Sequence, residues 1–213
     1  MIAIIDYRAG NLTSVLRAVN KLGFEAKITS DRREILAAAR VIFPGVGAAG
    51  RAMKDLKELG LAETIRDAVA QNKPVLGICL GTQIIMEYSE ENDTECLGVI
   101  KGQVRSFPSP LMDQAGGRLK IPHMGWNRAV LTRPHPIFQG IPPESEFYFV
   151  HTYFPVPADQ SLTLAKTLHG IEFASALGRD NLIAVQFHPE KSGPPGLTLI
   201  KNFCIWQPGE SAH

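Results

Sequence analysis

Residues 74–83 read PVLGICLGTQ, an apolar run that passes directly into a segment compatible with a helix. Residues 75–78 have the composition of a buried strand, and we expect a helix over residues 82–88. Between them lies GICLG at 77–81, the pattern of a nucleophile elbow, in which a tight turn presents a reactive side chain. A side chain at either glycine would collide with the neighbouring strand or helix. The stretch predicts a strand, a turn carrying Cys79, and a helix.

The first half of the chain alternates short β-branched runs with amphipathic segments, which is typical of βα units around a parallel sheet. The expected strands cover residues 2–5, 24–28, 41–43 and 75–78, and the expected helices cover 12–21, with Gly23 as its C-terminal cap, and 61–70. The second half is richer in strands, which we expect at 99–107, 128–132, 147–154, 162–167 and 183–187, before a closing helix at 197–206. No internal repeat interrupts this pattern. We predict a single α/β domain over residues 1–213, with an open, twisted, mixed but mainly parallel sheet flanked by helices.

Composition excludes several classes of partner. Lys plus Arg total 22 against 21 for Asp plus Glu, so no field of one sign points to nucleic acid or an anionic membrane. Three cysteines without the spacing of a zinc site suggest a reducing compartment. The first residues lack the pattern of a signal peptide, and no apolar run reaches the roughly 20 residues of a membrane span. We expect a cytoplasmic protein.

Cys79 has two interpretations. It could be a nucleophile at the elbow, or it could fill the core at the end of a strand, since free cysteine is among the most buried residue types. Cys204 lies on an apolar helical face and is expected in the core, whereas Cys96 receives no role. The choice for Cys79 depends on the partners that the chain offers it.

A base and its orienting group follow the strand expected at 183–187. Residues 186–190 read QFHPE, and Pro189 favours an extended backbone at His188. In an extended chain the side chains at i and i+2 lie on the same side, so Glu190 can bond to the His188 ring. Alone, His188 would be an ordinary strand-end histidine and Glu190 a solvated carboxylate. Beside a strand that carries Cys79, they form the partners that a nucleophilic thiol needs.

Acyl transfer also needs donors for a developing oxyanion. In an elbow, one donor is the N–H of the residue after the nucleophile, here Leu80. The segment PGVG at 44–47 could present a second N–H from an adjacent loop, although such a sequence is more often an ordinary turn.

With these residues assembled, the chain resembles the class I, triad-type glutamine amidotransferases, whose signatures are GICLGxQ and HPE. The match covers nearly the whole chain. Five segments narrow the resemblance to family members that serve as glutaminase subunits of imidazole glycerol phosphate synthases: IIDYRAGNL at 4–12, PGVG at 44–47, PHMGWN at 122–127, YFVHTY at 148–153 and QFHPEKSG at 186–193.

The resemblance implies a catalytic triad in which Cys79 attacks the glutamine amide, His188 protonates the departing ammonia and Glu190 orients His188. It implies an oxyanion hole formed by Leu80 with Val46 or Gly47, in which the Val46 peptide turns before it donates. The residues that it implies for substrate binding are Gln83 and the backbone of His151, Thr152 and Tyr153. No metal and no organic cofactor is implied.

The resemblance also implies a partner, a (β/α)₈-barrel cyclase subunit that forms a heterodimer with this chain and receives its ammonia. Asn11, Trp126 and Lys191 match family positions that face the cyclase. Each has a simpler interpretation: Asn11 as a helix cap, Trp126 as a core aromatic residue, and Lys191 as a solvated charge. Thr82 and Phe154 depart from the family pattern, in which methionine and tyrosine are common, and this leaves the shape of the glutamine pocket open.

Three other functions remain open. The glutaminase subunit of another synthase, such as pyridoxal phosphate synthase, would keep the chemistry and change the partner. A non-catalytic module on the same fold is disfavoured by the intact Cys79, His188 and Glu190. A cysteine peptidase would have no reason for Gln83 beside the elbow.

Overall fold

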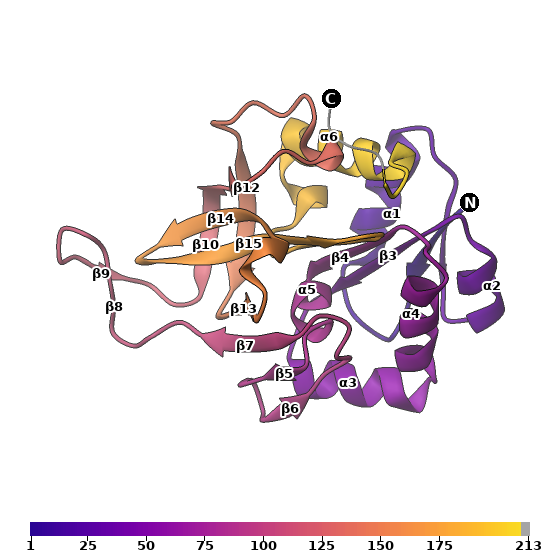
Figure 1. The fold of residues 1–213 in the computed structure, drawn as a ribbon, viewed down its shortest axis with the longest axis horizontal. Helices are drawn as coiled ribbons and strands as arrows, with labels where there is room; N and C mark the ends of the chain where they lie inside the picture. Colours follow the sequence, from indigo (N-terminus) through magenta and orange to yellow (C-terminus); the bar gives the residue numbers. More distant parts are fainter. Residues whose placement is uncertain (210–213) are drawn as a thin grey trace.

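A computed structural model describes residues 1–209, in which one large sheet organises the molecule (Figure 1). Its eight strands follow one another in space as β11 (Val130–Leu131), β14 (Thr163–His169), β15 (Ile171–Arg179), β16 (Leu182–Val185), β4 (Val75–Cys79), β3 (Arg40–Gly45), β1 (Ile2–Ile5) and β2 (Ala26–Thr29). The five strands from β16 to β2 run parallel. Strands β15, β14 and β11 add antiparallel pairs at one edge. The predicted mixed, mainly parallel sheet is confirmed.

Helices cover both faces of the sheet because successive side chains of its strands point to opposite faces. Ile2 and Ile4 pack on one face with α1 and α6, whereas Ala3 and Ile5 pack on the other with the remaining helices. The α-helices are α1 (Leu12–Lys21), α2 (Arg32–Ala37), α3 (Ala49–Glu58), α4 (Leu61–Ala70), α5 (Leu80–Ile84) and α6 (Gly193–Ile205), and the short 3₁₀ helices are η1 (Pro136–Phe138), η2 (Gln160–Leu162) and η3 (Pro189–Lys191). None of the helices within residues 1–209 is long and apolar enough to cross a membrane.

Smaller sheets extend the strand-rich half beyond the main sheet. They comprise β10 (His123–Arg128) with β12 (Glu146–His151); β13 (Tyr153–Pro157), β7 (Gly102–Ser106), β5 (Tyr88–Ser89) and β6 (Thr94–Glu95); and the hairpin of β8 (Leu111–Met112) with β9 (Arg118–Leu119). The β8–β9 hairpin projects away from the rest of the molecule (Figure 1).

Several sequence predictions match to the residue, namely the strand at 2–5 and the helices at 12–21 and 61–70. Gly23 follows the first helix with φ 84°, a backbone conformation that favours glycine and ends helices.

The helix predicted over residues 82–88 is wrong, because α5 ends at Ile84. The carbonyl oxygens of Ile84, Ile85 and Met86 accept hydrogen bonds from the backbone N–H groups of residues 97–100. The chain thus folds back and satisfies these carbonyls from a distant segment, so no further helical turn is needed. The same contact explains why β7 begins at Gly102 and not near residue 99.

Other boundaries in the second half also differ from the predictions. The strand expected at 147–154 is two strands, because the chain turns at Thr152 and β12 pairs with β10 while β13 pairs with β7. The strand expected at 128–132 is likewise divided between β10 and β11. Helix α6 begins at Gly193, earlier than expected, because Pro194 and Pro195 occupy its first turn, where no backbone N–H is needed.

Among the longer elements, the helices α2 and α3 and the strand β15 have no counterpart among the predictions. Helix α3 lacks a local start signal, since Ala48 at its N-cap position makes no side-chain cap. The N–H of Ala49 donates instead to the Glu91 carboxylate at 2.7 Å, so the cap comes from a distant part of the chain.

Candidate active site

Cys79 ends β4 in a strained turn. Its backbone angles, φ 53° and ψ −107°, lie outside the regions that non-glycine residues ordinarily occupy. Such a conformation persists only when the surrounding structure holds it. A Cβ atom at Gly81 would clash with the carbonyl oxygen of Phe43 in β3, so the glycine after the elbow is required. The elbow predicted from the sequence is therefore present.

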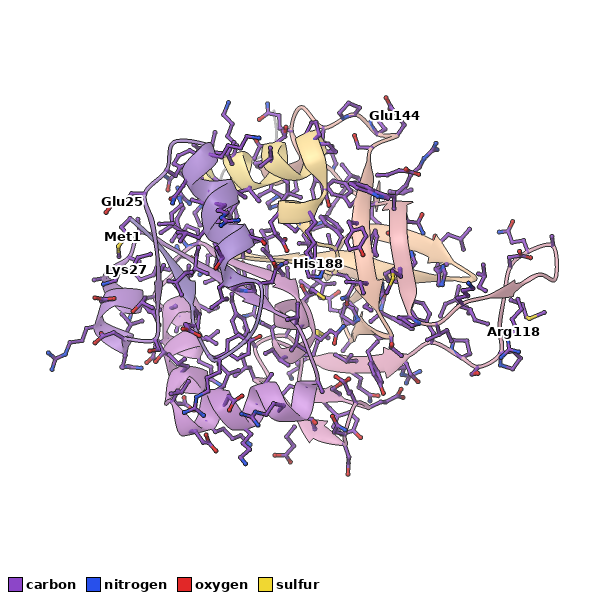
Figure 2. The ribbon with its side chains drawn as sticks, turned by 180° about the vertical axis from the view of Figure 1, so that it is seen from behind. Met1, Glu25, Lys27, Arg118, Glu144 and His188 are labelled. Atoms are coloured by element: carbon purple, nitrogen blue, oxygen red, sulfur yellow. The ribbon has the colours of Figure 1, made fainter. Side chains whose placement is uncertain are left out.

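His188 and Glu190 reach the same edge of the sheet. Strand β16 pairs in parallel with β4, with Val185 opposite Ile78, so the chain leaving β16 runs beside the elbow. His188 Nδ1 lies 2.9 Å from Glu190 Oε1, and both side chains are only 1% exposed. Figure 2 shows His188 near the middle of the molecule, whereas Arg118 marks the far end of the β8–β9 hairpin. The expected pairing across two residues is present.

The other ring nitrogen of His188 faces the pocket that contains Cys79. Nε2 is buried and has no hydrogen-bond partner within residues 1–209. Cys79 Sγ lies 3.8 Å from the amide nitrogen of Gln186 and 4.0 Å from the carbonyl oxygen of Val150. With Nδ1 held by Glu190, Nε2 is left to exchange a proton with the sulfur or with a bound substrate.

The protonation of His188 reflects its two side-chain partners. Burial lowers the pKa of the imidazole, but the interactions with Cys79 and then Glu190 outweigh burial and raise this pKa to about 9. The imidazolium form is therefore favoured at neutral pH, and it is the form that can protonate a leaving group.

Asn11 joins this group through the orienting carboxylate. Its amide nitrogen donates to Glu190 Oε1 at 2.6 Å, the same oxygen that bonds to His188. Asn11 occupies the N-cap position of α1 in a left-handed conformation, φ 70°, and its side chain caps no helical N–H. The interpretation of this side chain as a helix cap is wrong: it contacts the triad.

Cys79 and His188 both line one pocket of about 300 Å³. Its lining residues are Val46, Gly47, Cys79, Leu80, Gln83, Glu91, Pro122, Val150, His151, Thr152, Tyr153 and His188. The residues expected for the oxyanion hole and for substrate binding all line it, together with Cys79 and His188. Thr82 and Phe154, the departures from the family pattern, do not. The Thr82 hydroxyl donates to the Val185 carbonyl oxygen at 2.6 Å, and Phe154 packs against Phe107.

Gln83 is fixed by a small polar network. Its amide nitrogen donates to the Tyr153 carbonyl oxygen at 2.9 Å and to Gln186 Oε1 at 3.2 Å. Gln186, which the sequence analysis did not select, lies two residues before His188 and so on the same side of an extended chain. That spacing was the signal that could have identified it.

Glu91 is a second residue that the sequence analysis missed. It is the one carboxylate that lines the pocket among the described residues, and it also accepts the N–H of Ala49. A carboxylate here can balance the charge of a substrate ammonium group. No local pattern marks Glu91, because Glu90 and Asp93 are acidic residues in the same short segment.

Two further histidines form a neutral pair beside the pocket. His151 Nδ1 lies 2.8 Å from the Tyr153 carbonyl oxygen, and its Nε2 lies 3.0 Å from His123 Nδ1. The Asn127 amide nitrogen is 3.2 Å from His123 Nε2. Burial lowers the pKa of His151 to about 3 and that of His123 to about 4. The pair is uncharged at neutral pH, and His151 fixes the position of the Tyr153 carbonyl.

Trp126 and Lys191 lie together on the surface. The Trp126 side chain is 54% exposed, so its interpretation as a core residue is wrong. Tyr148 lies between the two, with its ring 6.0 Å from that of Trp126 and 5.8 Å from Lys191 Nζ. The structure therefore places an aromatic and basic surface next to the buried triad.

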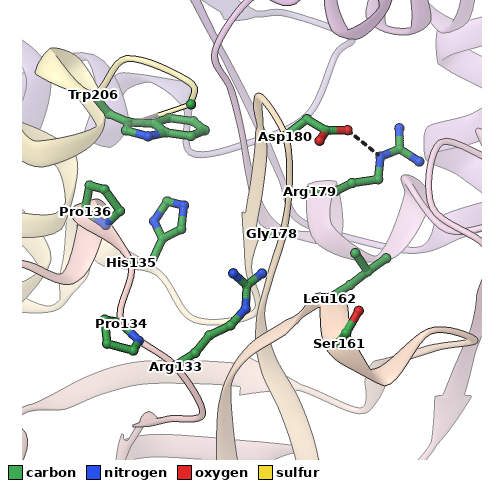
Figure 3. Close-up of a pocket in the computed structure, with 11 residues that line it drawn as sticks. Arg133, Pro134, His135, Pro136, Ser161, Leu162, Gly178, Arg179, Asp180 and Trp206 are labelled. Atoms are coloured by element: carbon green, nitrogen blue, oxygen red, sulfur yellow. Dashed lines mark ion pairs between the residues drawn. The ribbon is translucent and has the colours of Figure 1, made fainter. Parts of the chain in front are cut away.

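A larger hollow, of about 760 Å³, lies elsewhere. Arg133, His135 and Trp206 line it, and Arg179 pairs with Asp180 at 3.8 Å on its other side (Figure 3). It contains no cysteine and none of the residues singled out from the sequence. The reactive groups belong to the smaller pocket.

Comparison with known proteins agrees with this geometry. The family model of class-I glutamine amidotransferases matches residues 3–206. The chain belongs to this family and is a glutamine amidotransferase, as its resemblance indicated.

Within this class, the chain is similar to several HisH subunits. The chain is 52% identical to imidazole glycerol phosphate synthase subunit HisH of Maridesulfovibrio salexigens, over 95% of each chain. It is 50% identical to the HisH subunit of Desulfovibrio desulfuricans, over 100% of this chain and 99% of that one. It is 48% identical to the HisH subunit of Aromatoleum aromaticum, over 97% and 99%.

Solved structures share the fold at low identity. A crystal structure of a glutamine amidotransferase superposes with a TM-score of 0.73 at 17% identity, covering 96% of this chain and all of that one. The glutaminase domain of Trypanosoma brucei CTPS gives a TM-score of 0.63 at 19% identity, over 95% and 93% of the two chains.

Proposed function

We propose that this chain is the glutaminase subunit of an imidazole glycerol phosphate synthase, which hydrolyses glutamine to glutamate and supplies ammonia to a cyclase subunit for histidine biosynthesis. The observation that carries the proposal is the pocket in which Cys79 and His188 meet Glu91, in a chain that is 52% identical to a HisH subunit over 95% of its length. The pocket offers a thiol for the amide and a carboxylate for an ammonium group, which are the two ends of free glutamine.

In the first half of the reaction, His188 Nε2 already holds the proton of the Cys79 thiol, and Cys79 Sγ attacks the side-chain amide carbon of glutamine. The N–H of Leu80, with that of Val46 or Gly47, stabilises the oxyanion. His188 then returns its proton to the departing nitrogen, and the carbon–nitrogen bond breaks to release ammonia. The raised pKa of His188 supports this role, because its protonated form persists at neutral pH.

In the second half, water attacks the γ-glutamyl thioester. His188 accepts a proton from the water and retains it as the carbon–sulfur bond breaks, so that glutamate leaves and the resting Cys79–His188 pair is restored. Glu190 holds Nδ1 throughout, which keeps Nε2 aimed at the reacting atoms.

Substrate binding uses the rest of the pocket. Glu91 accepts hydrogen bonds from the α-ammonium group, which adds one residue to those expected from the sequence. Gln83 and the backbone of residues 151–153 bind the remainder of the amino-acid end. The network that fixes Gln83 and His151 supports this assignment, since both side chains are held before glutamine enters.

The partner that fits is a (β/α)₈-barrel cyclase in a heterodimer. The surface around Trp126 and Lys191 would bind it, and Asn11 would connect this surface to Glu190. Exposure of Trp126 beside the triad supports this placement. Buried free cysteines at positions 79, 96 and 204 suit a cytoplasmic enzyme.

The test is glutamate release from glutamine by the purified chain, with and without a cyclase subunit and its nucleotide substrate. We expect strong stimulation by both together and loss of activity in Cys79→Ala. Cys204→Ala removes a buried thiol outside the pocket and serves as the matched control, which should retain activity.

Two outcomes would redirect the proposal. Glutaminase activity that survives Cys79→Ala would overturn the mechanism. Activity that depends on Cys79 but ignores the cyclase would point to another synthase, such as pyridoxal phosphate synthase.

A further inference from the structure

A buried hydroxyl lies beneath the proposed oxyanion hole without a partner. Tyr7 follows β1, is 1% exposed and packs its ring against Phe43 at 5.3 Å. Its hydroxyl has no hydrogen-bond partner within the described part of the chain. A buried polar group in this state destabilises the fold, so its retention calls for a reason.

The Tyr7 hydroxyl touches the segment that would supply the second oxyanion donor. A Cβ atom at Gly45 would clash with it, and the same atom would lie 3.1 Å from Leu80 Cβ. Further along the loop that carries Tyr7, a Cβ atom at Gly10 would lie 3.2 Å from a Val46 methyl group. This loop therefore contacts both residues of the Gly45–Val46 peptide.

The direction of that peptide follows from the strand that contains it. The N–H of Val41 donates to the Pro74 carbonyl oxygen on the β4 side, and Gly45 still lies opposite Cys79. Backbone groups alternate along a strand, so odd-numbered residues of β3 direct their N–H and C=O groups toward β4. The Val46 N–H points away from β4, and the Gly45 carbonyl points toward it. The peptide must rotate before Val46 can donate to an oxyanion beside Cys79.

We propose that Tyr7 is a positioning residue whose hydroxyl donates a hydrogen bond to the Gly45 carbonyl oxygen once the Gly45–Val46 peptide has rotated to aim the Val46 N–H at the substrate. Rotation turns the carbonyl from the β4 side of β3 toward the β1 side, and Tyr7 lies in the loop that follows β1. Gly45 permits the change because it has no side chain. This inference rests on the proposed glutaminase function.

The hydroxyl keeps its proton for this role. Burial of the ring, followed by the charges at Cys79 and Asp55, raises the pKa of the Tyr7 phenol well above its ordinary value. Tyr7 is therefore a donor throughout the pH range of the reaction.

The test is Tyr7→Phe, which removes the hydroxyl and keeps the ring. Assayed as glutamine hydrolysis with the cyclase subunit and its substrate present, we expect kcat to fall about tenfold, the effect of one hydrogen bond made only in the active conformation, with KM nearly unchanged. The melting temperature should stay the same or rise, because the resting fold loses an unpaired hydroxyl. Alkylation of Cys79 by iodoacetamide should keep its rate, since it needs no oxyanion hole.

Tyr88→Phe is the matched control, because it deletes a hydroxyl that donates to Asp93 at 2.7 Å outside the pocket. It should leave kcat unchanged. A wild-type kcat in Tyr7→Phe would overturn the inference, and so would a lower melting temperature accompanied by slower alkylation, which would assign Tyr7 a structural role. If the wild-type chain released no glutamate under these conditions, the proposed function itself would fail, and this inference with it.

Discussion

His188 and His151 line the same pocket, are almost fully buried, and have opposite protonation. The pKa of His188 is raised to about 9, whereas that of His151 is lowered to about 3. Burial acts in the same direction on both rings, so it cannot explain the difference. His188 has a carboxylate and a thiol as partners, whereas His151 has a backbone carbonyl and a second histidine. The chemistry of the partner therefore decides which histidine carries a proton.

The neutral pair has only one satisfactory arrangement of hydrogens. If His151 Nδ1–H donates to the Tyr153 carbonyl, its Nε2 must accept from His123 Nδ1–H. His123 Nε2 then accepts from the Asn127 amide. A proton added to His151 would set two donors against each other, so this chain of bonds requires His151 to be neutral.

The largest effect should come from removing the negative partner of His188. Glu190→Gln keeps the shape of the side chain and removes its charge. We expect kcat for glutamine hydrolysis to fall about a thousandfold and the pKa of His188 to fall, measured by steady-state kinetics and by NMR titration of the ring. Glu87→Gln, at a carboxylate that accepts the Gly102 N–H, is the control. Loss of less than tenfold would contradict the role of Glu190.

The three cysteines also differ in their surroundings, and this difference should appear in their reactivity. Burial raises the pKa values of Cys96 and Cys204 to about 12, so at neutral pH both thiols stay protonated. We expect iodoacetamide to modify Cys79 about a hundredfold faster than either, followed by peptide mass mapping over time. Equal labelling of Cys96 or Cys204 would show that the environment of Cys79 is not distinctive.

The free energy of unfolding should fall in acid, because His123 and His151 are neutral in the folded protein. Free histidine titrates near pH 6.5, whereas the folded pKa values of His123 and His151 are about 4 and 3. Below about pH 6.5 the unfolded chain binds more protons, so the stability from this pair is present above that pH and is lost as pH falls toward 4. At pH 4 we expect a loss of about 6 kcal/mol in the free energy of unfolding from the two histidines together, since one pKa unit corresponds to about 1.4 kcal/mol.

His188 has the opposite sign: its raised pKa contributes stability that is complete below about pH 6.5 and is lost as pH rises through about 9. Urea unfolding at pH 7, 5.5 and 4 measures the acid effect. His151→Gln should flatten the dependence of unfolding free energy on pH in this range, and an unchanged slope would refute the assignment.

The smallest expected effect comes from giving the neutral pair a charged partner. Asn127→Asp places a carboxylate beside His123 Nε2, and it should raise the pKa of His123 by at least about one unit. A protonated His123 can still donate to His151, so kcat should stay within about twofold of the wild-type value. Asn127→Ala lacks the carboxylate and should not raise this pKa. NMR titration of His123 distinguishes the two variants. An unchanged His123 pKa in Asn127→Asp would contradict the conclusion that the partner decides which histidine carries a proton.

Local patterns predicted the parts of the fold that local chemistry determines. Glycine at 77 and 81, with the apolar run before Cys79, indicated the elbow, and the spacing of His188 and Glu190 indicated their pairing. These signals lie within a few residues of one another. Gln186 had the same kind of signal, because it precedes His188 by two residues.

Contacts between distant segments account for what sequence patterns missed. Helix α3 is capped by Glu91 from more than 40 residues away, and α5 ends where the segment after Leu97 bonds to its last carbonyls. The bond between Asn11 and Glu190 joins residues near the two ends of the chain. No window of sequence contains both members of such a pair, so neither Glu91 nor the contact of Asn11 with the triad could be identified locally.

Strands β4 and β16, which deliver Cys79 and His188, are neighbours inside the eight-stranded sheet, with paired strands on both sides. Backbone amides in such a position exchange with solvent chiefly through global unfolding, whereas loops open with much lower free energy. The distance between nucleophile and base is therefore set by the most persistent part of the molecule. Any change of catalytic state on the time scale of turnover has to come from the segments beyond the strand ends.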